Sequence, residues 1–187
     1  MTTDTPPPTT LTAFADFKRI AAGSPAEVAA ELRRRADTEP VFVFDDATGE
    51  PLDLDLRAGT PATPAPTAEP GTRAVGRPRL GVVPREVTLL PRHWDWLNSQ
   101  PGGASVALRK LVEDARRVNA DRDVVRGARE ATYRFMSAIA GHLPGFEEGA
   151  RALFAGQRER FESLVAAWPD DVRSHLHKLS AAAWSET

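Results

Sequence analysis

The chain has no cysteine among its 187 residues. That absence excludes disulfide bonds and thiolate metal sites. No apolar run approaches the roughly 18 residues of a membrane-spanning helix. Residues 1–10 are rich in threonine and proline, lack the basic and apolar regions of a secretory signal, and predict a disordered tail. We therefore expect a soluble cytoplasmic protein without membrane contact.

The short motifs of common enzymes are missing as well. There is no glycine-rich phosphate loop, no Gly-x-Ser-x-Gly and no His-Glu-x-x-His. The four histidines show no metal-ligand spacing beyond one His-x-His at His175 and His177. A group of acidic residues fits a turn and the polar face of a strand: Asp45, Asp46, Asp53 and Asp55. We therefore expect no catalytic residue, no metal site and no cofactor.

Charge is distributed unevenly, although the net charge is only −2. Residues 1–70 carry 6 Lys/Arg against 12 Asp/Glu, residues 71–129 carry 12 against 6, and residues 130–187 carry 6 against 8. A basic middle between acidic ends is typical of a segment that binds a polyanion. A chance clustering of surface arginines would give the same totals, and that alternative stays open here.

The first part of the chain, residues 11–58, predicts a small βαββ unit with an apolar core of its own. Alternating apolar residues within 11–22 indicate a strand. The run Ser24-Pro25-Ala26-Glu27 combines the cap, the first-turn proline and the glutamate of a helix start, and the helix is expected to reach about Asp37. Two runs separated by a turn sequence predict a hairpin after it: 41–44 and 51–57.

Residues 59–81 form a Pro-rich linker that ends in a basic arm, the clearest boundary in the sequence. Residues 119–187 are expected to be helical, because apolar residues recur at helical spacing within 124–139 and again within 146–168. Pro169 and the aspartates after it open a short last helix.

Between these parts, residues 82–118 predict a short strand followed by two helices. Arg85–Leu90 alternates and is β-branched, which indicates a strand. Pro91 begins an amphipathic helix, Pro101-Gly102-Gly103 breaks it, and Ser105 is expected to cap a second helix. A single strand before two short helices cannot cover its own edge. We therefore expect a second copy to pair with it across a two-fold axis.

The same segment resembles the ribbon-helix-helix family of DNA-binding proteins. The likeness lies in Val87–Leu89, in Trp96-Leu97, in Gly103–Ser105 and in the run Leu108–Glu113. It implies that two chains form an antiparallel β-ribbon that enters the major groove of DNA, while the start of the second helix presents N–H groups to a phosphate. The dimer core that it implies consists of Val87, Leu89, Trp94, Leu97, Leu108 and Leu111.

DNA contact is expected from the ribbon and from the arm before it. Glu86 and Thr88 face the groove, but phosphates repel a glutamate, which can accept only from a cytosine amino group. Upstream, Gly76-Arg77-Pro78 matches the core of an AT-hook, whose extended arginine-bearing segment lies in a narrow minor groove. A merely basic linker is the alternative for that arm. The predicted DNA-binding residues are Arg77, Arg79, Arg85, Glu86, Thr88, Gly103 and Ser105.

Over nearly its whole length, the sequence resembles an uncharacterised bacterial family of domains of unknown function (number 2239). The strings that carry the likeness are FDDATGEPLDLDLR, GRPRLGVVPREVTLLPRHWDWL, QPGGASVALRKLVEDARR and YRFMSAIAGHLPGFEE. This second likeness implies no activity.

The sequence therefore predicts an α+β homodimer with an N-terminal βαββ unit, a ribbon-helix-helix-like dimerisation core and a helical C-terminal region. The predicted function is DNA binding, as a transcriptional regulator or a nucleoid-associated protein, without enzyme activity. In the alternative, the ribbon only dimerises and the helical region binds a protein partner, with no DNA binding.

Overall fold

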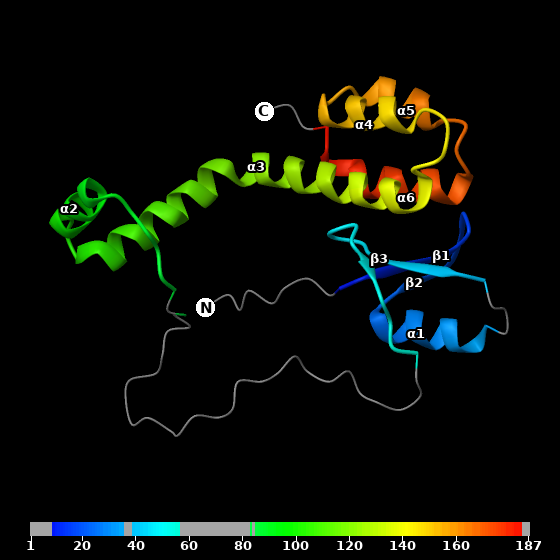
Figure 1. The fold of residues 1–187 in the computed structure, drawn as a ribbon, viewed down its shortest axis with the longest axis horizontal. Helices are drawn as coiled ribbons and strands as arrows, with labels where there is room; N and C mark the ends of the chain where they lie inside the picture. Colours follow the sequence, from blue (N-terminus) through cyan, green and yellow to red (C-terminus); the bar gives the residue numbers. More distant parts are fainter. Residues whose placement is uncertain (1–8, 36–38, 57–82, 84, 185–187) are drawn as a thin grey trace. The chain divides into compact units, whose positions relative to one another are not determined.

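The computed structural model of the chain describes residues 9–35, 39–56, 83 and 85–184. Its elements divide into two compact units (Figure 1). We call residues 1–56 with 119–187 the sheet unit, and residues 57–118 the hairpin unit. The predicted α+β class is confirmed, since a small antiparallel sheet near the N-terminus precedes most of the helices.

The sheet has four strands in the order β2-β1-β3-β4, and every neighbouring pair is antiparallel. The strands are β1 (Leu11–Ala15), β2 (Lys18–Gly23), β3 (Val41–Asp45) and β4 (Pro51–Leu52). All residues of β1 are buried, because this strand has a neighbour on each edge and a helical layer on each face.

The first segment contains two strands where the sequence predicted one. Asp16 has a φ of 52° and turns the chain between β1 and β2. Aspartate tolerates this left-handed conformation better than most residues. Apolar residues continue on both sides of the turn, so the pattern did not reveal the reversal. The N-terminal segment is therefore ββαββ, and the expected βαββ order is wrong.

Helix α1 (Pro25–Arg34) begins where the sequence predicts. The Glu27 N–H donates to the Ser24 hydroxyl at 3.4 Å, and the Ser24 N–H donates to the Glu27 carboxylate at 2.8 Å. These reciprocal bonds form a capping box. The helix ends at Arg34, about a turn before the expected end. Its buried residues recur at helical spacing on one face: Val28, Ala29 and Leu32.

The hairpin after α1 is confirmed, but its second strand is shorter than predicted. The Asp45 carboxylate accepts hydrogen bonds from the Ala47 and Thr48 N–H groups at 2.7 and 2.9 Å, which supports the predicted turn. Only Pro51 and Leu52 pair with β3, and residues 53–56 form no strand. A short edge strand with a proline offers few open backbone groups to another chain.

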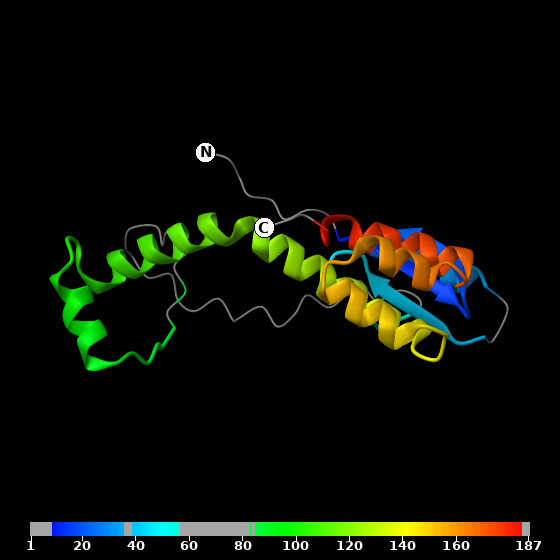
Figure 2. The same cartoon turned by 90° about the horizontal axis from the view of Figure 1, so that it is seen from above.

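Helices cover both faces of the sheet within the sheet unit (Figures 1 and 2). On one face, α1 packs over Leu11, Ala13 and Val43. On the other face, Phe14 and Phe44 enter a larger cluster formed with the C-terminal helices. Those helices are α3 (Gly103–Ala140), α4 (Phe146–Phe154), α5 (Arg158–Val165) and α6 (Asp170–Leu179), followed by a 3₁₀ turn, Ser180–Ala182.

Phe135 of α3 joins the sheet to the helices. Its ring centroid lies 5.3 Å from that of Phe14 and 4.9 Å from that of Phe44. The turn before β4 also meets α3, because a Cβ at Gly49 would lie 2.0 Å from the Ala131 carbonyl oxygen. The described residues of the N-terminal segment thus share the larger core with the C-terminal helices, and they form only the smaller cluster under α1 by themselves.

The helical C-terminal region is confirmed, with different boundaries. Helix α3 is continuous from Gly103 to Ala140, where we expected two helices. Ion pairs one turn apart support its polar middle, among them Arg116–Glu113 at 3.5 Å and Arg117–Asp114 at 3.7 Å. The apolar residues within 146–168 lie on two separate helices, α4 and α5, and not on one face of a single helix. None of the described helices combines the length and the apolar character needed to cross a membrane.

His175 of α6 is buried among the rings of the sheet unit. Its ring centroid lies 4.5 Å from that of Phe135, and in the described part of the chain its Nε2 has no hydrogen-bond partner. Asp46 is 3.7 Å away, but its carboxylate accepts from the Thr12 hydroxyl and the Lys178 ammonium at 2.7 Å each. Burial lowers the pKa of His175 to about 4, although the Asp46 charge opposes this.

We expect this histidine to make the folded protein acid-sensitive. The unfolded chain binds the His175 proton below about pH 6.5, whereas the folded protein binds it only below about pH 4. Stability should therefore fall as the pH drops through that window. From about pH 7 to about pH 5, the free energy of unfolding should decrease by about 2 kcal/mol. Urea unfolding at both pH values measures this change.

Two variants identify the group responsible. His175→Leu removes the buried histidine, and His177→Leu is its control because His177 is exposed on the same helix. The first variant should flatten the pH dependence and the second should retain it. An equal pH dependence in His175→Leu and the unmodified chain would show that another group causes the loss.

Candidate dimer and nucleic-acid interface

The hairpin unit contains α2 (Pro91–Ser99) and the start of α3, joined by a tight turn. Pro91 begins α2 as predicted, since proline lacks the N–H that a first-turn residue leaves unused. The Leu90 carbonyl accepts from the His93 and Trp94 N–H groups at 2.8 and 3.3 Å. The turn closes with a bond from the Gly103 N–H to the Gln100 carbonyl at 2.9 Å.

The expected cap at Ser105 is wrong. Helix α3 begins at Gly103, so Ser105 lies within its first turn, where a capping residue cannot sit. Its carbonyl accepts from the Arg109 side chain at 3.0 Å. Ser105 is nevertheless exposed and Gly103 is half-buried. Both predicted phosphate-binding residues therefore do lie at a helix start.

The predicted ribbon strand, Arg85–Leu90, forms no strand within the chain. A ribbon strand pairs with a second copy, so this expectation stays a prediction. Arg85, Glu86 and Thr88 are exposed, as a groove-facing role requires. Leu89 is half-buried and Val87 is 52% exposed.

An apolar hollow of about 290 Å³ lies in the hairpin unit, between the segment before α2 and the two helices. Four predicted dimer-core residues line it: Leu89, Leu97, Leu108 and Leu111. Leu97 is buried within the chain, whereas Leu111 remains 45% exposed. One chain therefore supplies the walls of the hollow, but its side chains leave the space inside empty.

Two residues that line the hollow, His93 and Trp96, were not among the predicted dimer-core residues. The apolar pattern of this helix predicts that Trp94 and Leu97, one turn apart, face inward. The structure instead brings Trp96 and His93 to the hollow beside Leu97, at helical spacings that also share a face. Trp94 is half-buried and does not line the hollow. In a helix of nine residues, Leu97 shares a face with Trp94 and also with His93 and Trp96. Helical spacing alone therefore did not show which of these residues line the hollow.

Several large apolar side chains of the hairpin unit remain in contact with solvent. Each of them is between 45% and 56% exposed: Val87, Leu90, Trp96, Leu111 and Val112. Apolar side chains gathered on one small unit are typical of a surface that meets another protein. Two of the predicted dimer-core residues, Val87 and Leu111, are among these exposed side chains.

The two remaining predicted site residues are arginines that lie outside the described part of the chain. The structure therefore gives Arg77 and Arg79 no position. Within the described residues, no three His, Asp or Glu side chains gather where a metal ion could bind.

Comparison with curated proteins gave no match, and comparison with solved structures gave none either. One protein family matches residues 10–180, a span that reaches into both units. Its description is "Uncharacterized protein conserved in bacteria (DUF2239)". The match covers far more than half of the chain, and the protein therefore belongs to this bacterial family.

Proposed function

We propose that the protein is a homodimeric DNA-binding protein of the bacterial cytoplasm, acting as a transcriptional regulator or a nucleoid-associated protein. The hairpin unit supplies both the dimer core and the DNA contacts. One observation carries the proposal: the apolar hollow is lined by Leu89 of the segment Arg85–Leu90, which has no strand partner among the residues that the structure describes.

A second copy of the hairpin unit fits this surface for two reasons. An antiparallel partner would supply the strand pairing that Arg85–Leu90 lacks among the described residues. The same partner covers the exposed side chains around the hollow. Complete burial of an exposed side chain such as Leu111 or Val87 stabilises by roughly 1.5–3 kcal/mol.

The outer face of such a ribbon carries the DNA contacts. With Val87 and Leu89 inward, Thr88 and Glu86 point outward, and exposed Arg85 lies at the end of the ribbon. Gly103 and Ser105 add the N–H groups of the first turn of α3, where a phosphate is favoured. Arg77 and Arg79 add positive charge upstream.

The second candidate function is a dimerising protein-interaction module without DNA binding. Two observations favour it. Glu86 is exposed on the face that would meet phosphates. Farther along α3, Arg116 and Arg117 pair with the acidic residues one turn before them and are already neutralised. Measured DNA affinity separates the two functions.

Replacing Arg77 and Arg79 with alanine should weaken DNA binding and flatten its salt dependence. Each lost phosphate contact removes about 0.9 from the slope of log affinity against log salt, so the double variant should lose up to about two. The dimer should be unchanged, because neither residue is apolar. Fluorescence anisotropy of a labelled duplex at several salt concentrations measures the slope.

A matched control replaces Arg158 and Arg160 with alanine, since both are exposed on α5 of the sheet unit. The control should keep the slope of the unmodified protein. Equal slopes in all three proteins would exclude the basic arm from the DNA interface.

A further inference from the structure

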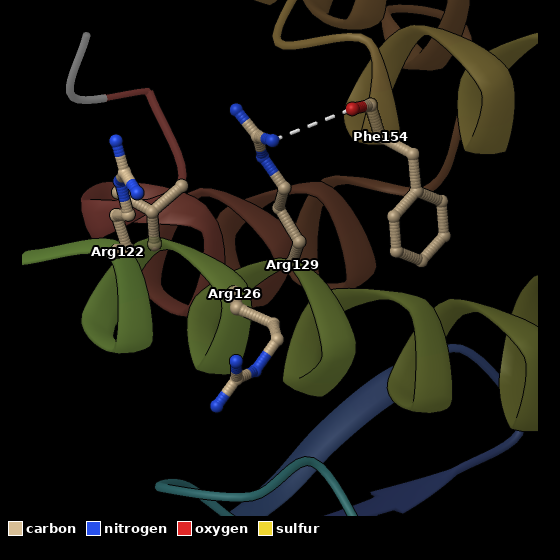
Figure 3. Close-up of a pocket in the computed structure, with 5 residues that line it drawn as sticks. Arg122, Arg126, Arg129 and Phe154 are labelled. Atoms are coloured by element: carbon tan, nitrogen blue, oxygen red, sulfur yellow. Dashed lines mark hydrogen bonds between the residues drawn. The ribbon is translucent and has the colours of Figure 1, made fainter. Parts of the chain in front are cut away.

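We propose that the sheet unit binds a small organic anion with a planar ring, in a hollow between α3 and α4 (Figure 3). This hollow has a volume of about 330 Å³ and shares no residue with the hairpin unit. Its lining consists of Arg122, Val125, Arg126, Arg129 and Phe154, without a carboxylate. The inference therefore does not depend on DNA binding.

Arg129 is held rigidly at the wall of the hollow. Its Nε donates to the Ala183 carbonyl at 3.1 Å, and its Nη1 donates to the Phe154 carbonyl at 3.3 Å (Figure 3). Gly156 makes room for it, because a Cβ there would lie 2.9 Å from Nη2. A guanidinium has five N–H donors, so others remain for a ligand. Its orientation is fixed before any ligand arrives, which lowers the entropic cost of binding.

Arg122 supplies a second cation on the same face of α3. It lies two helical turns before Arg129, with Val125 between them at helical spacing. In the described part of the chain, Arg122 has neither an ion pair nor a hydrogen bond, so its charge is available. Arg126 differs, since it pairs with Asp123 at 2.9 Å and points away from Phe154 (Figure 3). The positive charge of the hollow therefore comes from Arg122 and Arg129.

Phe154 adds an aromatic surface to this pair of cations. Phe154 as a residue is 49% exposed, and Tyr133 packs against its ring with ring centroids 5.5 Å apart. Val125 is buried and provides an apolar floor. A planar ring can stack on Phe154 while an attached phosphate or carboxylate binds the guanidinium groups. The volume of the hollow lies in the range of small-molecule sites, which begins at roughly 300 Å³.

Nucleotides and aromatic carboxylates both combine a planar ring with an attached anion. Isothermal titration calorimetry of the full chain with adenosine monophosphate and with benzoate shows which of these two ligand classes binds. Adenosine and inorganic phosphate serve as controls that carry only the ring or only the anion. We expect saturable binding of one complete ligand, at least about tenfold tighter than either control.

Arg122→Gln and Phe154→Leu should each weaken that binding about tenfold or more. Arg151→Gln is the matched control, because this exposed arginine lies on α4 outside the hollow, and it should change nothing. Thermal melting of each variant confirms that it is folded. The proposal is overturned if neither complete ligand binds at millimolar concentration, if inorganic phosphate binds as tightly, or if both folded variants bind like the unmodified chain.

Discussion

Leu111→Asp should convert the proposed dimer into a folded monomer. The Leu111 side chain lines the hollow of the hairpin unit and is 45% exposed in a single chain, so an aspartate there remains solvated in the monomer. In the dimer, the two-fold axis would bury two carboxylates in an apolar interface, each at a cost of several kcal/mol. Light scattering gives the molar mass, and circular dichroism gives the helix content.

The matched control is Val118→Asp, because Val118 lies on the same helix, is 80% exposed and does not line the hollow. It should remain dimeric. Leu89→Asp, in the predicted ribbon, should behave like Leu111→Asp. If both variants at the hollow stay folded and dimeric, the dimer interface lies elsewhere in the chain.

Phe135→Ala should destabilise the sheet unit by about 3–5 kcal/mol. Phe135 is fully buried and touches both aromatic residues of the sheet, Phe14 and Phe44, as well as His175 of α6. A cavity at this position removes contacts that α3 makes with the sheet and with α6. Urea unfolding followed by circular dichroism gives the free energy.

Phe42→Ala is the control for that measurement, since the Phe42 side chain lies on the same sheet but is 43% exposed. Phe42→Ala should lower the free energy of unfolding far less than Phe135→Ala does. A loss below about 1 kcal/mol for Phe135→Ala would show that the sheet and the C-terminal helices do not share a core.

Local signals in the sequence predicted local structure well. The capping box of Ser24 and Glu27 placed the start of α1, and Pro91 placed the start of α2. Each of these signals acts through bonds between residues a few positions apart, so a single sequence displays it. The turn at Asp16 carried no glycine or proline, and the strand pair that it creates was missed.

Non-local packing could not be predicted in the same way. Phe14 and Phe135 meet in one core although more than a hundred positions separate them, and neither residue's neighbours indicate the other. The continuity of α3 was missed for a different reason. Charged residues interrupt its apolar periodicity near position 118, but the helix continues through them, with ion pairs one turn apart on its surface.

The candidate dimer surface was predicted in part. Leucines at helical spacing identified most of the hollow, because apolar periodicity reports which face of a helix is covered. Spacing did not reveal Trp96, since its exposure of 52% depends on the angle at which α2 meets α3. The second hollow, in the sheet unit, was not predicted. Its residues Arg122 and Phe154 come together only because α4 folds onto α3, and no sequence pattern indicates that contact.

Titration of a fluorescently labelled DNA duplex with the unmodified protein tests the central claim most directly. At low salt we expect saturable binding by two chains per site, with log affinity falling linearly as log salt rises. Light scattering of the same sample should give the mass of a dimer. Absence of DNA binding at low salt, in a sample that is folded and dimeric, would contradict the claim and leave a dimerising protein-interaction module as the function.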